Sequence, residues 1–273
     1  MAITAKDVNA LRQQTGMGMM ECKKALTDAD GDVAKAIELL RERAGGKMDT
    51  REAAAGEGAI AVAQGATPDG HTAIAMVKVM TETDFSARNE DFLTKLQQIA
   101  DHALALDATG EVKPNDAIKE IIEGLRLTIK ENIAFGQGLR VVAPHAASYV
   151  HTNRKSAAVV TADGELDDEL LRGLCMHVTA AVPPVCPAPL ALDEAGLAPE
   201  TVEAAKKVFV EEAAATGKPP EIAEKIAGGK MNKWISDHTL LGQTYIKEMD
   251  AKKPVKHYLP DGATLTSFTR FAV

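Results

Sequence analysis

The chain has 273 residues, of which 45% are hydrophobic and 26% charged, and its formal net charge is −8. This length allows one large domain or two to three small ones, and the apolar content is sufficient for buried cores. Contacts with phosphates need clustered Lys and Arg, so an acidic chain without such clusters argues against a nucleic-acid-binding protein and favours a protein partner.

Residues 1–55 are predicted to form a bundle of three short helices followed by a linker. Thr4 and Asp7 have the spacing of a capping box, which marks the start of the first helix. Apolar residues then recur at helical spacing between small residues, and the predicted helices cover residues 4–15, 19–26 and 32–44. The small and polar residues 45–58 predict a linker.

Residues 56–140 are predicted to form the N-terminal half of a two-part α+β core. Apolar runs at 59–63 and 73–80 flank a turn at Pro68-Asp69-Gly70, which is typical of a β-hairpin. Two amphipathic helices follow, with apolar residues at Phe92, Leu96, Ile99 and Ala103 in the first and at Ile118, Ile121, Ile122, Leu125 and Ile129 in the second.

Residues 141–187 and 230–273 are predicted to form the C-terminal half of this core, because a similar order recurs there. Strands expected at 139–142, 148–151 and 157–161 precede a helix from about Asp167, and residues 264–271 alternate like a last strand. His102 and His177 hold matching places in the two helices, so we interpret the halves as a weak internal repeat. Both histidines are expected to pack or cap.

Residues 188–229 are predicted to form a helical hairpin inserted into the second half. The proline-rich residues 183–189 break regular structure, and Pro199 opens a helix. Residues 216–220 turn the chain, and the returning helix is expected to be interrupted or capped near Gly228 and Gly229. Two helices joined by so short a turn should lie antiparallel and protrude.

Residues 83–89 form a corner between the strand at 73–80 and the next helix. Asn89 has the character of a helix N-cap, so one interpretation is structural, with Phe85 stapling the helix to the sheet. The other is functional, because the corner offers Asp84 and Phe85 side by side as a contact for a partner.

Motifs for catalysis, cofactors and metals are weak throughout the chain. The glycine pairs at Gly16 and Gly18 and at Gly136 and Gly138 lack a full phosphate-binding loop, and no two histidines have the spacing of a zinc hydrolase. We therefore predict no catalytic residues, no cofactor and no metal site.

The cysteines and the absence of apolar segments predict a cytoplasmic protein that is not bound to a membrane. Cys22, Cys175 and Cys186 fit neither a disulfide framework nor a metal site, so reduced thiols are expected. The N-terminus has no apolar signal core, and no stretch approaches the roughly 20 apolar residues of a membrane span.

Several segments together resemble the elongation factor Ts family, in the same order and over nearly the whole chain. They are residues 11–26, 31–37, 83–89, 148–151, 176–178, 217–226 and 240–245. The resemblance implies that the N-terminal bundle has the ubiquitin-associated fold. It also implies a nucleotide exchange factor that binds elongation factor Tu, both GDP-bound and nucleotide-free, and promotes exchange of GDP for GTP.

The resemblance also implies which residues contact elongation factor Tu. The tip Thr83, Asp84, Phe85 and Ser86 would disturb the Mg²⁺ and phosphate site of the partner, and further contacts would come from Met19, Met20, Lys23, Ile129 and His151. The residues themselves leave open whether the methionines around residue 19 form a contact surface or fill the bundle core. The hairpin is implicated in self-association in some members.

Three positions depart from the family pattern. Ser86 stands where Val is usual and Lys130 where Gly is common, and the sequence ends at Val273, where some relatives continue into a further helix. The main rival function is an adaptor that docks on another protein without altering its ligand. A second rival is an enzyme with a site between the two halves.

Overall fold

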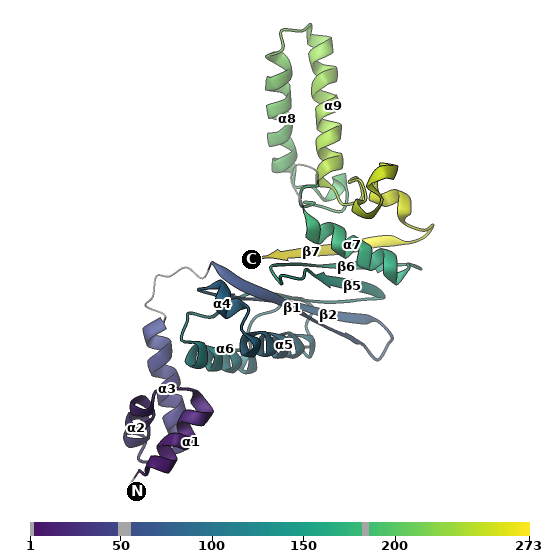
Figure 1. The fold of residues 1–273 in the computed structure, drawn as a ribbon. Coiled ribbons are helices and arrows are strands. Elements are labelled where there is room, and N and C mark those ends of the chain that lie inside the picture. The colour runs from purple at the N-terminus through teal and green to yellow at the C-terminus, as the bar shows by residue number, and fades with distance from the viewer. Residues whose placement is uncertain (1–2, 49–55, 182–185) are drawn as a thin grey trace.

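The computed structural model describes residues 3–48, 56–181 and 186–273 and shows an α+β protein (Figure 1). The predicted linker and the start of the proline-rich segment lie partly outside these residues. The helices are α1 (Ala5–Thr15), α2 (Met19–Asp28), α3 (Val33–Met48), α4 (Asp84–Ala87), α5 (Glu90–Leu104), α6 (Asp116–Ile129), α7 (Asp168–Ala180), α8 (Pro199–Ala214) and α9 (Pro220–His238). The strands are β1 (Glu57–Ala66), β2 (Thr72–Thr81), β3 (Gly110–Glu111), β4 (Ala134–Ala143), β5 (His145–Val150), β6 (Ser156–Asp163) and β7 (Thr264–Ala272).

Helices α1 to α3 pack around one small core. The capping box is confirmed, since the Thr4 side chain accepts from the Asp7 backbone and the Asp7 side chain accepts from the Thr4 backbone. Gly16 ends α1 in the left-handed conformation at φ 65°, which costs glycine little. The expected end of the third helix at Gly45 and Gly46 is wrong, because α3 continues through both glycines. Glycine only weakens a helix interior, and here it does not break one.

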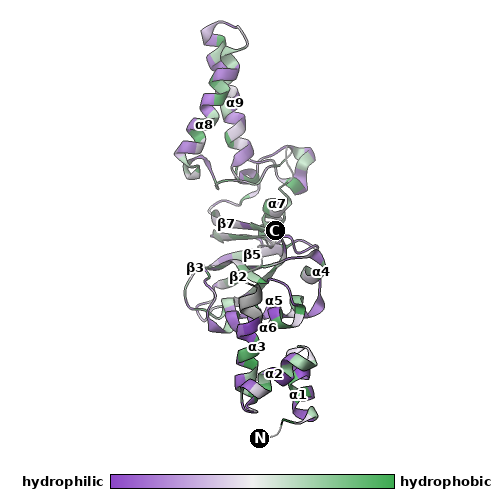
Figure 2. Cartoon of the chain, turned by 90° about the vertical axis from the view of Figure 1, so that its left-hand side faces the viewer, coloured by the Kyte–Doolittle hydropathy of each residue, from purple (hydrophilic) through white to green (hydrophobic). Residues whose placement is uncertain are grey.

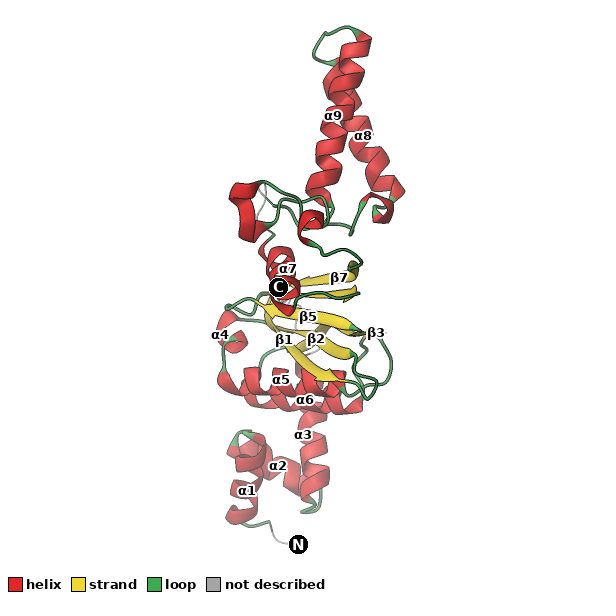
Figure 3. Cartoon of the chain, turned by 90° about the vertical axis from the view of Figure 1, so that its right-hand side faces the viewer, coloured by secondary structure: helices red, strands yellow, loops and turns green. Residues whose placement is uncertain are grey.

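The first sheet is antiparallel, with strand order β1-β2-β4-β3, and α5 and α6 cover one of its faces (Figure 3). Ala75, Val77 and Val79 of β2 face these helices, while Ile74 and Met76 face the second sheet. Both faces of β2 are therefore buried, which explains why its sequence is a continuous apolar run rather than an alternation.

The second sheet has strand order β5-β6-β7 and is covered by α7. The strand expected at 139–142 as the start of the second half instead belongs to β4, which pairs with β2 as far as Ala143. The predicted boundary after residue 140 therefore falls inside a strand of the first sheet. The reason is long-range pairing, which the local pattern of residues 139–142 does not contain.

The two sheets pack face to face and are also joined by polar links. Their shared core includes Ile60 and Met76 from the first sheet and Val159 and Phe271 from the second. The Lys78 ammonium group donates to the Ala272 carbonyl at 2.9 Å, and the Ile60 N–H donates to the Arg154 carbonyl at 2.9 Å. The order of layers is therefore helices, sheet, sheet, helix.

Helices α8 and α9 form the predicted antiparallel hairpin, which projects away from the core (Figure 1). Hydrophilic residues cover much of both helices (Figure 2). The expected break at Gly228 and Gly229 is wrong, as is the end of the hairpin at residue 229, because α9 runs unbroken to His238. No helix within the described residues is long and apolar enough to cross a membrane.

His177 of α7 holds the base of this hairpin. It is fully buried, its Nδ1 accepts the Ile246 N–H at 3.2 Å, and its Nε2 lies 2.9 Å from Gln243 Oε1. Since Nδ1 must accept, Nε2 carries the proton and donates to Gln243. Gln243 in turn donates to the carbonyl of Asp237, at the end of α9. The expectation that His177 packs is confirmed, whereas His102 is exposed in the last turn of α5.

This network predicts a loss of stability in acid. Burial lowers the pKa of His177, and the hydrogen bond to Gln243 offsets this only in part. The unfolded chain therefore binds a proton more readily than the folded one. The contribution of neutral His177 to the free energy of unfolding is fully present above its ordinary pKa of about 6.5. Below that pH it falls, by at most about 1.4 kcal/mol per pH unit. Urea unfolding at pH 7.5 and 5.5 measures the difference. His177→Asn, which cannot titrate, should show a smaller loss than the parent, and equal losses would contradict this role.

Candidate functional site

The corner between β2 and α5 is a one-turn helix, α4, that the sequence interpretation missed. Thr83 is its N-cap, with an extended backbone and a hydroxyl that accepts the Ser86 N–H at 3.3 Å. The N-cap at Asn89 is confirmed, since its side chain accepts from Asp91 and Phe92 at the start of α5. Two capped helices thus follow each other directly, which forms the sharp corner.

Phe85 points into solvent from this corner and is 83% exposed. Ser86 and Ala87 on the same short helix are buried, so the turn has an inner and an outer side. The structural interpretation of Phe85 as a staple is therefore wrong, because Phe85 covers no part of the core. A large aromatic side chain kept outside the core of the chain is available to another molecule.

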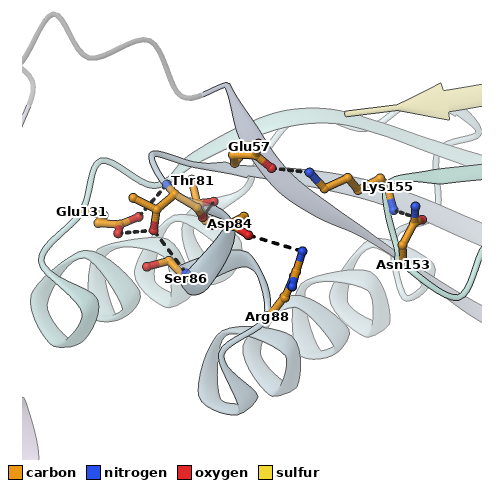
Figure 4. Close-up of polar contacts among 9 residues, drawn as sticks. Glu57, Thr81, Asp84, Ser86, Arg88, Glu131, Asn153 and Lys155 are labelled. Carbon is orange, nitrogen blue, oxygen red and sulfur yellow. Dashed lines mark hydrogen bonds and ion pairs between the residues drawn. The ribbon is translucent and has the colours of Figure 1, made fainter.

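Asp84 lies beside Phe85 and pairs with Arg88 one turn later, at 3.3 Å between Oδ2 and Nη2 (Figure 4). Both groups are partly exposed, so the pair contributes little to stability. The corner therefore presents an aromatic ring, a carboxylate and a guanidinium group within one helical turn.

The inner side of the corner is held by Glu131, which follows α6 (Figure 4). The Thr83 hydroxyl donates to Glu131 Oε1 at 2.6 Å, and the Thr83 N–H donates to Oε2 at 3.2 Å. The Asn132 N–H donates in return to Glu82 Oε1 at 2.9 Å. Nothing in the local sequence pattern indicated Glu131, because it is 48 residues away from Thr83.

The turn that carries His151 lies beside the corner. Glu57, the first residue of β1, pairs in register with Thr81 just before the corner, and its carboxylate forms an ion pair with Lys155 (Figure 4). Lys155 belongs to the β5–β6 turn, in which His151 is exposed and its Nδ1 lies 3.3 Å from the Tyr149 hydroxyl. The structure therefore brings the corner and the His151 turn to one end of the stacked sheets.

The methionines around residue 19 divide between core and surface. Met17 is buried in the bundle, whereas Met19 and Met20 are exposed, Met20 by 75%. Lys23 is exposed on the same helix and lines a shallow depression together with Met20. Helices α2 and α4 lie on the same side of the molecule (Figure 1). Met17 therefore fills the bundle core, whereas a contact surface formed by Met19 and Met20 stays a prediction.

Ile129 differs from the other predicted contacts, because it is half-buried and packs against the core under α5 and α6. The next residue, Lys130, ends α6 with a left-handed backbone at φ 65°, and its N–H donates to the Arg126 carbonyl at 3.0 Å. This backbone reversal directs the chain from α6 towards Glu131 and the corner.

The described residues contain no cluster of three or more His, Cys, Asp or Glu side chains that could hold a metal ion. Cys22, Cys175 and Cys186 are free and buried, and burial raises the pKa of Cys175 to about 12. A buried neutral thiol is a poor nucleophile, so Cys175 is suited to packing.

Comparisons with known proteins give one consistent result. The profile of a family described as "Elongation factor TS" matches residues 82–273. Proteins named elongation factor Ts are similar over the full chain, which covers 92% of each: the one from Methylococcus capsulatus is 35% identical, that from Thioalkalivibrio sulfidiphilus 36%, and that from Shewanella loihica 37%.

The left-handed backbone of Lys130 generates a prediction about stability. A non-glycine residue in this conformation costs about 1–2 kcal/mol. Glycine avoids this cost, but part of the gain is lost because glycine also makes the unfolded chain more flexible. Lys130→Gly should therefore be more stable than Lys130→Ala by about 1 kcal/mol in urea unfolding. The alanine variant controls for the contacts of the lysine side chain, and a glycine variant no more stable than it would contradict the strain argument.

Proposed function

The chain belongs to the elongation factor Ts family of translation elongation factors, and from this premise we propose that it binds elongation factor Tu carrying GDP and promotes exchange of GDP for GTP. In this proposal the exposed corner of residues 83–86 enters the partner and disturbs its Mg²⁺ and phosphate site. The observation that carries the proposal is Phe85, an exposed aromatic side chain on a corner whose inner side is hydrogen-bonded to the core.

The exchange activity is a thermodynamic coupling. If the factor binds the nucleotide-free form of the partner more tightly than the GDP form, GDP binding must weaken by the same ratio. Each tenfold weakening requires about 1.4 kcal/mol. Burying one Phe side chain supplies about 1.5–3 kcal/mol, so Phe85 accounts for one to two powers of ten and the wider interface supplies the rest.

Asp84 and Phe85 have different roles in this proposal. Phe85 inserts as an apolar wedge, and Asp84 meets the partner by hydrogen bonding or charge repulsion rather than as a metal ligand. Mg²⁺ tolerates little departure from octahedral geometry at about 2.0–2.1 Å, so a small shift of the loop that supports it is enough to weaken its binding.

The remaining contacts extend the interface along the molecule. Met19, Met20 and Lys23 of α2 offer an adaptable apolar surface next to a positive charge, and His151 lies in the turn beside the corner. Ile129 is half-buried, so it contributes a smaller contact or supports the corner from below. The partner would thus bridge the bundle and the core.

The same family membership supports proposals about where the chain acts and how its parts are built. The chain acts in the cytoplasm as a binding protein rather than as an enzyme, and α8 and α9 serve self-association. The bundle adopts the ubiquitin-associated fold. An internal repeat relates the two halves of the core, and a shared connectivity supports it. In each half a hairpin is followed by helix and then by a strand that pairs antiparallel with the second strand of the hairpin. These pairs are β4 with β2 and β7 with β6.

Phe85→Ala should slow the release of a fluorescent GDP analogue from elongation factor Tu by at least about tenfold at saturating factor, because the wedge is lost. The fold should be unaffected, since Phe85 covers no part of the core. Leu190→Ala removes another exposed apolar side chain, near the base of the hairpin, and should keep the parental rate. If Phe85→Ala accelerates GDP release at the parental rate, Phe85 does not act as a wedge.

Met20→Ala and Met17→Ala form a matched pair on the bundle. Met20→Ala should raise the dissociation constant for elongation factor Tu by about three- to tenfold without changing the free energy of unfolding, because Met20 is exposed. Met17→Ala should lower the free energy of unfolding by about 2 kcal/mol or more, because it leaves a cavity in the core. Calorimetry and urea unfolding measure the two effects. Unchanged binding by Met20→Ala would remove α2 from the interface.

A further inference from the structure

Two donors of Thr83 converge on a single carboxylate. Glu131 accepts the Thr83 hydroxyl on Oε1 at 2.6 Å and the Thr83 N–H on Oε2 at 3.2 Å. Glu131 itself is only partly exposed. Both of its oxygens are therefore engaged on the inner side of the corner whose outer side presents Phe85.

A carboxylate accepts both Thr83 donors at once, and its charge strengthens both hydrogen bonds. The Thr83 hydroxyl has one proton, and one of its lone pairs accepts the Ser86 N–H at 3.3 Å, so the proton is free to go to Glu131. The Thr83 N–H needs a second acceptor, which Oε2 supplies. A Gln side chain has only one acceptor oxygen. If that oxygen takes the Thr83 N–H, its NH₂ group faces the Thr83 hydroxyl, which must then accept instead of donate, and both bonds lose the charge of the acceptor.

The ionisation of Glu131 agrees with this geometry. Partial burial raises the pKa of its carboxyl group, but hydrogen bonds from the Thr83 and Ser86 side chains and from the backbone outweigh this effect, so the pKa lies below its ordinary value. Glu131 is therefore a charged acceptor near neutral pH, and hydrogen bonds to a charged acceptor are stronger than neutral ones.

Helix α4 needs such support because it has only four residues. A single helical turn fixes several backbone dihedrals for one hydrogen bond and is unstable by itself. The Thr83–Glu131 and Asn132–Glu82 hydrogen bonds join the corner to the end of α6 in two places. These hydrogen bonds connect segments that are about 50 residues apart in the chain.

We propose that Glu131 is the positioning residue of the exchange tip: it holds Thr83 and Ser86 so that Phe85 is presented to the partner in one orientation. The inference rests on the proposed exchange function. Glu131 does not touch the nucleotide or the metal of the partner. It acts by keeping the tip ordered before binding, so that binding energy is not spent on ordering it.

The test compares the parent, Glu131→Gln and Glu90→Gln in the full-length chain. Glu90 is exposed in the first turn of α5, so its variant removes the same charge close to the corner without removing the Thr83 bonds. Hydrogen exchange of the Thr83 and Ser86 amides in the free protein reports the order of the tip. We expect Glu131→Gln to accelerate both by about tenfold, and Glu90→Gln to leave them unchanged.

The same proteins are then assayed for GDP release from elongation factor Tu. Glu131→Gln should lower the maximal rate by about tenfold, with a smaller change in the factor concentration that gives half the maximal rate. Thr83→Val removes the hydroxyl partner. The double variant Thr83→Val/Glu131→Gln should lose less than the two single losses combined, because the bond between the Thr83 hydroxyl and Glu131 is broken in both single variants.

The outcomes separate the two proposals. Unchanged amide exchange in Glu131→Gln refutes the positioning role, and so does a loosened tip that still exchanges nucleotide at the parental rate. Additive losses in the double variant also refute it, since they would show that Thr83 and Glu131 act independently. A parental chain that fails to accelerate GDP release refutes the proposed function itself, whatever the state of the tip.

Discussion

Helix α6 is the constraint on which the arrangement of the molecule depends. Its Leu127 is part of the bundle core, while Ile118 and Leu125 belong to the core beneath the first sheet. At its C-terminus the left-handed Lys130 leads directly to Glu131, which holds the corner of residues 83–86. One helix thus joins the bundle, the first sheet and the corner, so the surfaces that we assign to partner binding keep a defined relation to each other.

The stacking of the two sheets adds the remaining part of the candidate interface. Glu57 begins β1 beside the corner and pairs with Lys155 in the β5–β6 turn, which belongs to the second sheet. The Arg154 carbonyl in the same turn accepts the Ile60 N–H of β1. His151 therefore lies beside the corner because the halves of the core are packed and hydrogen-bonded together, even though about 65 residues separate it from Phe85.

Local rules predicted the elements that depend on neighbouring residues. The Thr4 capping box, the Asn89 N-cap, the β1–β2 hairpin and the helix at Asp168 all follow from short-range patterns, and the structure has them. The errors have two causes. The sheet to which β4 belongs depends on long-range pairing, whereas α3 and α9 continue through glycine pairs because glycine weakens a helix without breaking it. Of the candidate site, the exposed Phe85 could be anticipated, but its support by Glu131 could not, because no periodicity links residues 48 positions apart.

Exchange by way of the metal site can be measured as the release of a fluorescent GDP analogue from elongation factor Tu, with and without the parental chain, over a range of Mg²⁺ concentrations. We expect strong acceleration at low Mg²⁺ that diminishes as Mg²⁺ rises, because the factor and the ion weaken each other's binding to the partner. No acceleration at saturating factor would contradict the exchange function and favour an adaptor. Acceleration independent of Mg²⁺ would contradict the proposed action on the metal site.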